Sequence, residues 1–325
     1  MARTASKPDA SEAVTSAQAA RFAGEIERLW PEGGRLGLAV SGGPDSLALL
    51  LLAQRALTGR FAVATVDHGL RPEARAECAM VARLCADLGI PCAVLAVETG
   101  DGNLQAAARK ARYGALGEWA RREGLTALAT AHHADDQAET LMMRLNRASG
   151  LAGLAGVRPR GAIADSSLPV IRPLLAWRRA ELAAIVARAG LEPAHDPSNL
   201  DEAYDRVRMR QALATADWLD VEAVAESAAH LADAQEALEW MVERDWNENV
   251  SVADSGICYE PGAPRAVALR VVSRIIAGFG GSPRGAALAR LIEGLQAGSQ
   301  GNLGGVAACV EDGGWLFRPE TPRRG

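Results

Sequence analysis

Short apolar runs alternate with longer mixed stretches from Leu36 to Thr130. The runs are nearly continuous in apolar residues, which is typical of parallel strands buried on both faces. They are Leu36–Val40, Phe61–Val66, Ala93–Val97 and Ala127–Thr130. The stretches between them have helical length and end beside a glycine, the residue that commonly terminates a helix. They are Asp45–Leu57, Pro72–Leu88 and Asn103–Arg122. Three consecutive β-α-β units predict a doubly wound parallel α/β sheet, which binds ligands beyond the carboxyl ends of its strands.

The pattern changes after about Gln211. Apolar residues recur there with helical spacing as far as Trp246, and the remainder combines strand-like runs with glycine-rich turns and a helical segment near Arg284–Leu295. This change predicts a second, smaller domain that is mostly helical or α+β. The chain therefore divides into a tail at residues 1–20, a main α/β domain at 21–212, and a helical linker with an accessory domain at 213–325.

The composition indicates a soluble protein of the cytoplasm. The tail is rich in Ala, Ser and Thr without a long apolar run, which predicts disorder and argues against a signal peptide. No apolar run approaches the length of a membrane span. Five cysteines are an odd number without an export signal, so we expect reduced thiols, with Cys78 and Cys85 as small core residues rather than metal ligands.

The balance of charges does not by itself decide whether the protein binds nucleic acid. A formal net charge of −5 argues against a nucleic-acid partner when it is taken as an average. However, arginines are concentrated between Arg158 and Arg179 and again between Arg206 and Arg210. This distribution predicts a localised basic face, which an acidic total does not exclude.

The first candidate site is the turn LAVSGGPDS at Leu38–Ser46. Glycines let backbone N–H groups approach an anion closely, the following helix presents its positive end, and two serines add hydroxyl donors. These features favour phosphate binding. The residues concerned are Ser41, Gly42, Gly43, Pro44, Asp45 and Ser46.

Asp45 and its neighbours distinguish this turn from two common phosphate-binding motifs. The turn has neither the lysine of a P-loop nor the G-x-G-x-x-G pattern of a dinucleotide site. A carboxylate beside a phosphate requires a bridging cation, which predicts Mg²⁺ bound by Asp45. An ordinary capped turn, with Pro44 in the first helical turn, would explain the proline and one serine. It would explain neither the two glycines nor the aspartate.

Ser41–Ser46 resembles the SGGxDS loop of the N-type ATP pyrophosphatases, which cleave ATP between the α- and β-phosphates to adenylate a substrate. The resemblance implies a Rossmann-like fold, bound ATP and Mg²⁺, and the products AMP and pyrophosphate. The second strand ends in VDHGLR at Val66–Arg71, which looks like the adenosine-side loop of one branch, the tRNA(Ile)-lysidine synthetases. This likeness implies that Asp67 and His68 contact ATP.

Arg109 and Arg112 lie three residues apart in NLQAAARKARY, at Asn103–Tyr113, and so share a helix face. From the residues alone, a solvated stripe is the simpler interpretation. The segment resembles the Arg-x-x-Arg-Tyr segment of the same branch, which implies that Arg112 contacts ATP phosphate or the activated substrate.

The loop after the fourth strand, AHHADDQAET at Ala131–Thr140, is the densest in charged side chains. Apolar spacing from Ala138 to Leu145 predicts that a helix follows. Metal binding is one interpretation, although the spacing differs from HExxH. An acidic first turn that stabilises the helix dipole would explain the carboxylates but not the histidines. The pattern HHxDDxxET of the same branch matches every fixed position, and implies that amino-acid ammonium groups are held by His132, Asp136 and Glu139.

Three later segments extend the resemblance. Arg147–Gly156 is similar to a flexible glycine-rich loop of the branch, and Ile171–Leu175 to its RPLL segment. Asp205–Arg210 is similar to its Arg-Asn-Arg-Ile-Arg segment, with Val207 in place of asparagine. Gly301–Gly305 resembles the first accessory domain, which implies tRNA binding by residues 213–325 in a short form without the second accessory domain. The likeness also assigns catalysis to Arg206 and substrate binding to Arg172 and Arg208.

The resemblance implies a reaction in two steps. ATP adenylates the C2 carbonyl oxygen of the wobble cytidine in an isoleucine tRNA with a CAU anticodon, and the ε-amine of L-lysine then attacks C2 and displaces AMP. The catalytic residues would be Asp45, Arg112, Asp136 and Arg206. Asp136 is the hypothetical base for the lysine amine. RNA phosphates would bind the arginine clusters and the second domain, and a homodimer is left open.

Two other interpretations stay open. One is another enzyme with the same loop, for tRNA thiolation or amide formation, although the cysteine pairs of the first and the glutaminase domain of the second are not found in the sequence. The other is a non-catalytic nucleotide-binding module, which would need the glycine turn but not the carboxylates and arginines at the other strand ends.

Overall fold

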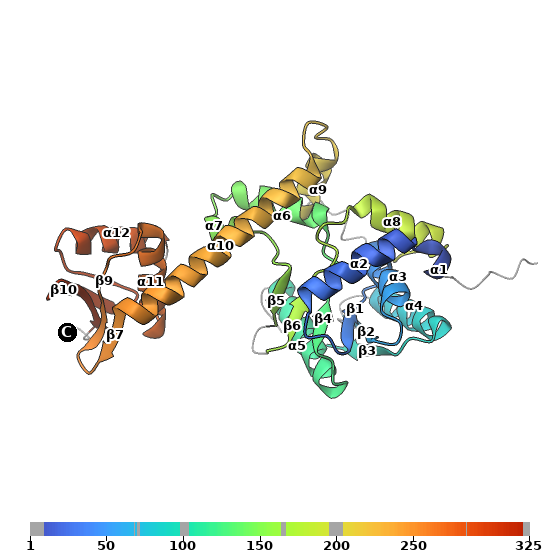
Figure 1. Ribbon diagram of the computed structural model, residues 1–325, viewed down its shortest axis with the longest axis horizontal. Helices are drawn as coiled ribbons and strands as arrows, with labels where there is room; N and C mark the ends of the chain where they lie inside the picture. Colours follow the sequence, from blue (N-terminus) through green and yellow to red (C-terminus); the bar gives the residue numbers. More distant parts are fainter. Residues whose placement is uncertain are drawn as a thin grey trace, which may run out of the picture. The chain divides into compact units, whose positions relative to one another are not determined.

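The computed structural model describes residues 10–67, 69, 72–97, 104–163, 167–194, 204–283 and 285–320 (Figure 1). The chain forms two compact units, Met1–Ala232 and Asp233–Gly325. The division falls within helix α10 (Val221–Asn249), whereas the boundary predicted after residue 212 falls within α9 (Asp205–Ala214). Residues 215–220, between α9 and α10, contain neither glycine nor proline. The usual residues that terminate a helix are therefore missing where α9 ends.

The first unit is built on a six-stranded sheet. Its strand order is β3-β2-β1-β4-β6-β5, and neighbouring strands are parallel except for β5 with β6. The strands are β1 (Leu36–Ala39), β2 (Phe61–Asp67), β3 (Cys92–Ala96), β4 (Ala127–Ala129), β5 (Arg160–Ala162) and β6 (Pro169–Ile171). The chain order reverses between β1 and β4, and doubly wound sheets bind ligands at such a switch point. The predicted Rossmann-like α/β class is confirmed.

Helices precede, connect and follow these strands, and those that follow β1, β2 and β3 pack on the sheet. The helices are α1 (Ala10–Ala13), α2 (Ser16–Leu29), α3 (Pro44–Ala56), α4 (Pro72–Leu88), α5 (Leu104–Arg122), α6 (Ala134–Leu145), α7 (Leu151–Leu154), α8 (Arg179–Arg188), α9 and the start of α10. Side chains alternate along a strand, so Leu36 and Leu38 of β1 join the core around α3 while the opposite face meets α5. A side chain at Gly37 would lie within 2.9 Å of the Trp119 ring. Glycine therefore lets α5 approach the strand closely.

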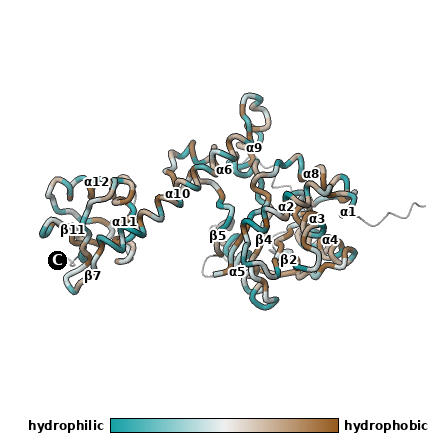
Figure 2. The backbone as a smooth tube through the Cα atoms, in the orientation of Figure 1, coloured by the Kyte–Doolittle hydropathy of each residue, from teal (hydrophilic) through white to brown (hydrophobic). Residues whose placement is uncertain are grey.

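Helix α3 lies deepest in this core. Every residue of Leu47–Ala53 is fully buried, and the helix lies in the hydrophobic part of the colour scale in Figure 2. It packs against both α2 and α8. A helix that is apolar on all sides is stable only when it is enclosed, so the start of α3 and the turn before it are held firmly.

The predicted disorder of residues 1–20 is wrong for the part that the structure describes. Helix α2 begins at Ser16 behind a capping box in which Thr15 and Gln18 bond each other's backbone N–H groups. Val14 is only 1 % exposed and joins the core around α3. The few apolar residues of this segment are widely spaced, which concealed its helices. Residues 1–9 lie outside the described part of the chain.

Two predictions of burial also fail. Ala93–Val97 was expected to be buried on both faces, but Val94 is 53 % exposed because β3 is an edge strand. Leu145 was expected on the buried side of its helix, but it is 51 % exposed at the last residue of α6. Periodicity identifies an element and its faces, but it cannot say which ends and edges the rest of the chain covers.

The second unit is a small α+β domain, as predicted. Its strands are β7 (Val250–Ala253), β8 (Gly256–Tyr259), β9 (Gly301–Leu303), β10 (Val306–Glu311) and β11 (Gly314–Pro319), and its helices are α11 (Arg265–Gly278) and α12 (Gly285–Gln296). The strands form an antiparallel sheet in the order β7-β8-β11-β10-β9. In the core, the Tyr259 hydroxyl donates to Asp245 at 2.7 Å. Burial raises the pKa of Tyr259 and the hydrogen bond to Asp245 raises it further, so the phenol stays protonated.

Two smaller expectations can be compared with the structure. Cys78 and Cys85 are buried, at 4 % and 0 % exposure, which confirms that they are small core residues. Among the helices that the structure describes, none combines the length and the apolar character that crossing a bilayer requires.

Candidate active site

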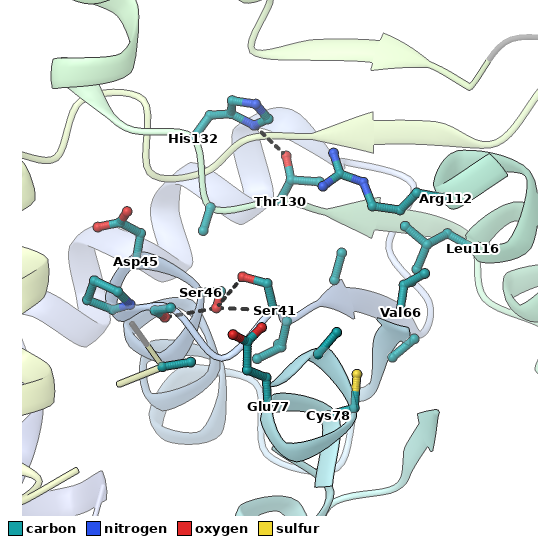
Figure 3. A pocket seen from close by; sticks show the side chains of 18 of the residues that line it. Ser41, Asp45, Ser46, Val66, Glu77, Cys78, Arg112, Leu116, Thr130 and His132 are labelled. Atoms are coloured by element: carbon teal, nitrogen blue, oxygen red, sulfur yellow. Dashed lines mark hydrogen bonds between the residues drawn. The ribbon is translucent and has the colours of Figure 1, made fainter. Parts of the chain in front are cut away.

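A cavity of about 550 Å³ opens at the carboxyl ends of β1, β2 and β4, next to the switch point (Figure 3). The turn after β1 contributes the first wall, which we call the glycine turn (residues 41–46). Arg112 of α5 and His132, which follows β4, lie across the cavity from this turn. The remaining side consists of Asp136 of α6 and of Arg206 and Arg210 of α9.

The glycine turn has the geometry of an anion site. Gly42 has a φ of +88°, which side-chain-bearing residues adopt only with strain. Gly43 is the N-cap residue of α3 and supplies no side-chain cap. The hydroxyl of Ser46 donates to the Gly43 carbonyl at 2.9 Å, accepts the Ser41 N–H at 3.2 Å, and lies 3.3 Å from the Ser41 hydroxyl. The first turn of a buried helix therefore presents its positive end to the cavity.

Asp45 stands in the first turn of α3. Its Oδ2 lies 3.3 Å from Nε2 of His133, but its Oδ1 is buried without a hydrogen-bond partner in the described part of the chain. An orphaned carboxylate oxygen suits a hard cation, and Mg²⁺ commonly takes one or two carboxylates together with phosphate oxygens and water. The described residues hold no cluster of three or more metal-binding side chains. The donor set therefore fits Mg²⁺ that is shared with a phosphate rather than caged by protein.

His133 lies behind Asp45 and is fully buried. It is the N-cap residue of α6, and its backbone N–H donates to Oδ2 of Asp136 at 3.1 Å. Burial alone would lower the pKa of His133, but the carboxylates of Asp135, Asp45 and Asp136 outweigh burial and raise it to about 9. The three carboxylates therefore favour the protonated form of His133, which pairs electrostatically with the glycine turn and with α6, over the neutral N-cap form, whose Nδ1 accepts the Asp136 N–H at 3.4 Å.

His132 has the opposite character. Its Nδ1 lies 2.9 Å from the hydroxyl of Thr130. Burial lowers the pKa of His132 to about 4, and Arg172, Arg206 and Arg109 lower it further while Asp136 opposes them. The pKa values of the two adjacent histidines thus shift in opposite directions, because burial prevails at His132 whereas the surrounding carboxylates prevail over burial at His133.

Carboxylates of α6 are already paired with arginines. Glu139 is only 1 % exposed, and its oxygens accept from Nε of Arg206 and Nε of Arg210, each at 2.8 Å. Arg179 adds a longer contact of 3.4 Å, and Nη2 of Arg206 donates to Oδ1 of Asp136 at 2.8 Å. We call this group the acid–arginine cluster: Asp136, Glu139, Arg179, Arg206 and Arg210.

Asp135 anchors α6 to α8. It accepts the backbone N–H of Arg179 at 2.8 Å and pairs with the guanidinium of Arg178 at 3.3 Å. Burial alone would raise the pKa of Asp135, but His133, the Arg179 N–H and Arg178 hold it well below its usual range. Several arginines expected on a basic face for RNA therefore bind carboxylates of the protein itself.

Helix α5, which follows β3, contributes two arginines that lie against a tyrosine ring. The guanidinium carbons of Arg109 and Arg112 lie 5.1 Å and 5.3 Å from the centre of the Tyr113 ring. Arg112 and Tyr113 line the cavity. Arg172 lies behind them and donates from Nη1 to the Arg158 carbonyl at 2.7 Å, and burial lowers the pKa of Arg172.

A buried glutamine closes the glycine-rich segment that follows α6. The amide of Gln137 donates to the Val157 carbonyl at 2.8 Å and accepts the Val157 N–H at 2.7 Å. Gly156 has a φ of +64°, and a side chain there would lie 2.6 Å from Oε1 of Gln137. Glycine is thus required where the segment returns to α6.

The structure brings most of the predicted site residues to one cavity. Those that line it are Ser41, Gly43, Pro44, Asp45, Ser46, Arg112, His132, Asp136 and Arg206. Gly42 shapes the turn from behind, and Glu139 and Arg172 contact lining residues or their loops without lining the cavity. Asp67 accepts the Gly69 N–H at 2.9 Å at the end of β2 and does not line the cavity. Arg208 pairs with Asp205 on the outer side of α9, and His68 lies outside the described residues.

Several residues of the site were not singled out from the sequence. Glu77 and Cys78 of α4 and Tyr113 line the cavity, and the Glu77 side chain points into it in Figure 3. Glu77 has ordinary helix residues as neighbours and no local signal marked it, Cys78 was expected only as a small core residue, and Tyr113 was expected only as part of the segment that contains Arg112. His133 could have been found, because a histidine directly before an acidic first helical turn is at the N-cap position.

Comparisons with known proteins agree with this site. A family model described as a PP-loop domain matches residues 14–216. A tRNA(Ile)-lysidine synthase from Novosphingobium aromaticivorans is 50% identical over 307 residues, which cover 93% of this chain and 94% of that protein. A second, from Zymomonas mobilis, is 41% identical over 303 residues, which cover 90% and 91%. The structure of U34-tRNA thiolase NcsA from Methanococcus maripaludis is similar in fold, with a TM-score of 0.55 and 15% identity over 68% of this chain and 80% of that one.

Proposed function

This chain belongs to the tRNA(Ile)-lysidine synthase family of PP-loop proteins, and we propose that it joins L-lysine to C2 of the wobble cytidine in an isoleucine tRNA with a CAU anticodon. The observation that carries the proposal is the meeting of two kinds of site in one cavity. The glycine turn offers an anion site beside an orphaned carboxylate oxygen, and His132, Asp136 and Arg206 offer polar groups to a second substrate. A nucleotide-binding module would need only the first.

ATP binds with its phosphates at the glycine turn. The N–H groups at the start of α3 and the hydroxyl of Ser41 would donate hydrogen bonds to the β- and γ-phosphates that leave as pyrophosphate, and the Ser46 hydroxyl would join them by leaving the Gly43 carbonyl. A Mg²⁺ ion held by Asp45 would neutralise charge on this leaving group. Arg112, which lies across the cavity in Figure 3, would bind the α-phosphate as the cytidine O2 attacks it. Asp67 and His68 complete the proposed contacts with ATP.

Lysine binds at the acid–arginine cluster. Both oxygens of Glu139 and one oxygen of Asp136 already accept from guanidinium groups. A lysine ammonium must therefore replace a guanidinium donor, and Arg206, which bonds both carboxylates, is the residue whose movement would free most acceptors. Asp136 is then the proposed base that removes a proton from the ε-amine before nitrogen attacks C2 and AMP leaves.

The anticodon loop delivers the cytidine as an unstacked base. Sequence-specific proteins read RNA mostly in such single-stranded loops. Arg172 and Arg208 are proposed contacts to the tRNA, and residues 213–325 are proposed to bind it outside the anticodon. The protein would act in the cytoplasm, and a homodimer stays a prediction.

The decisive experiment measures transfer of radiolabelled lysine to tRNA. A transcript of isoleucine tRNA with a CAU anticodon should become labelled only when ATP and Mg²⁺ are present, with release of one AMP and one pyrophosphate for each lysine. A transcript in which the wobble cytidine is replaced by uridine is the control and should stay unlabelled. Labelling without ATP, or none with the native anticodon, would overturn the proposal.

A further inference from the structure

Thr130 contacts His132, one of the residues that the proposed function assigns to lysine binding, and its role rests on that function. Thr130 follows β4 directly, and its hydroxyl lies 2.9 Å from Nδ1 of His132, which lines the cavity (Figure 3). Threonine has one hydroxyl that can donate and accept, whereas a neutral imidazole has one donor nitrogen and one acceptor nitrogen. The direction of this hydrogen bond therefore follows the tautomer of His132: Nδ1 donates to the hydroxyl when it carries the proton and accepts from it when it does not.

The sheet fixes the Thr130 hydroxyl in place. The residue is only 8 % exposed, and its backbone N–H donates to the Ile171 carbonyl of β6 at 3.1 Å. A β-branched side chain has few rotamers available in such a position. The hydroxyl is therefore a rigid reference point from which the imidazole of His132 is oriented.

The surroundings of His132 favour one tautomer. Arg109, Arg172 and Arg206 all act on it as cations, and together with burial they keep the ring neutral. Asp136 acts in the opposite sense, but its oxygens already accept from Arg206 and from the His133 N–H. With three guanidinium groups acting against one carboxylate that is already paired, a lone pair on Nε2, the nitrogen that Thr130 does not contact, is favoured over an N–H there. Nδ1 then carries the proton and donates to Thr130.

We propose that Thr130 is a positioning residue that holds His132 in the Nδ1–H tautomer, so that Nε2 presents a lone pair to an amino group of the lysine substrate. With this tautomer His132 accepts a hydrogen bond from the amino group. With the other tautomer it would present N–H to N–H, and lysine would lose one of its acceptors. Thr130 would act through His132 without touching lysine.

Kinetics with three variants test this role. Thr130→Val keeps the shape of the side chain but removes the hydroxyl, and we expect a fall in kcat/KM for lysine of about 10- to 100-fold, the size found when the partner that orients a metal-bound histidine is removed. The fall should appear mainly in KM for lysine. Thr130→Ser should restore most of the loss. Thr126→Val removes a hydroxyl before the other end of β4, which bonds the Gly33 carbonyl, and should behave like the unmodified protein.

Nitrogen NMR reads the tautomer directly. The chain contains five histidines, so the imidazole signals of ¹⁵N-labelled protein can be assigned with a His132→Asn variant. Nδ1 of His132 should carry the proton in the native protein, and in Thr130→Val the signals should shift toward the other tautomer. A native Nε2–H tautomer, or unchanged lysine kinetics in Thr130→Val, would overturn the inference alone. Failure of the native protein to transfer lysine would instead overturn the proposed function.

Discussion

The glycine turn and the acid–arginine cluster face the same cavity but satisfy their polar groups in opposite ways. At the glycine turn, α3 starts without a side-chain cap, and Oδ1 of Asp45 is buried without a partner among the described residues. In the cluster, guanidinium groups from two other helices satisfy both oxygens of Glu139. Because buried polar groups are normally paired, we expect the first region to obtain its missing partners from a ligand and the second to release some of its partners when a ligand binds.

The largest effect is expected at the glycine turn. Asp45→Asn removes the charge that would hold Mg²⁺ against the pyrophosphate, and we expect kcat to fall by about 10²- to 10³-fold, as for other lost transition-state contacts. Pyrophosphate release measured by a coupled assay checks this. Asp87→Asn, a change at an exposed position of α4, is the matched control. An Asp45→Asn enzyme with native kcat would show that the orphaned oxygen has no catalytic role.

Glu139→Gln should instead reveal itself in stability. The change leaves Arg210 without its buried countercharge and leaves Arg206 with Asp136 alone. Removal of one partner from a buried pair costs about 3 kcal/mol in free energy of unfolding, the low end of the usual range because the arginines are partly exposed. Urea denaturation measures the loss. Glu32→Gln removes a carboxylate that binds Arg160 at the surface at 2.8 Å and should change stability little. Equal losses in the two variants would remove the contrast between the regions.

The buried cation that joins the two regions predicts a pH dependence. The pKa of His133 is raised from 6.5 to about 9, so its contribution to stability is fully present below about pH 6.5 and is lost as the pH rises through 9. We expect a loss on the order of 2 kcal/mol over this window for the metal-free protein. Urea denaturation at several pH values measures the slope. His133→Gln should flatten it and His230→Gln, at an exposed position of α10, should not; a slope that persists in His133→Gln would refute the assignment.

The smallest expected effect separates backbone strain from ligand binding. Gly42→Ala and Gly59→Ala both place a side chain at positive φ, +88° and +75°, and each should cost about 1 kcal/mol in free energy of unfolding. Only Gly42 lies in the glycine turn, so only Gly42→Ala should also weaken ATP binding, measured by calorimetry. Equal ATP affinities in the two variants would mean that the turn tolerates distortion and is not a phosphate site.

Much of the first region follows from local sequence. A strand of Leu36 to Val40, two glycines and an apolar helix specify the turn between them, and the alternation of strands and helices specifies that the other loops meet it at one edge. The resemblance to the family pattern HHxDDxxET singled out His132, Asp136 and Glu139, and it could be recognised because HHADDQAET is continuous in the chain. Residues that act within one loop are readable without knowledge of the rest of the fold.

The pairing within the second region could not be read in this way. Glu139 meets Arg179, Arg206 and Arg210, which lie 40, 67 and 71 residues further along the chain. Those contacts depend on how α8 and α9 pack on α6, for which local periodicity has no signal. The same arginines were therefore expected to face RNA. The N-terminal helices were missed for a related reason. Val14 and Phe22 are buried only because they pack in the same core as α3, which is distant from them in sequence.

The two hydrogen bonds between the Gln137 amide and the Val157 backbone, which we call the Gln137 clasp, hold the two ends of the glycine-rich segment together. A side-chain amide that both donates to and accepts from Val157 imitates a neighbouring strand, and it closes a loop over the 20 positions that separate the two residues. Closing a loop of this length costs configurational entropy, and that cost is met when the protein folds. The two hydrogen bonds therefore fix both ends of the segment that leads from α6 to Val157. Release of the clasp would leave both amide groups unpaired, at a cost of about 1 to 3 kcal/mol for each buried group.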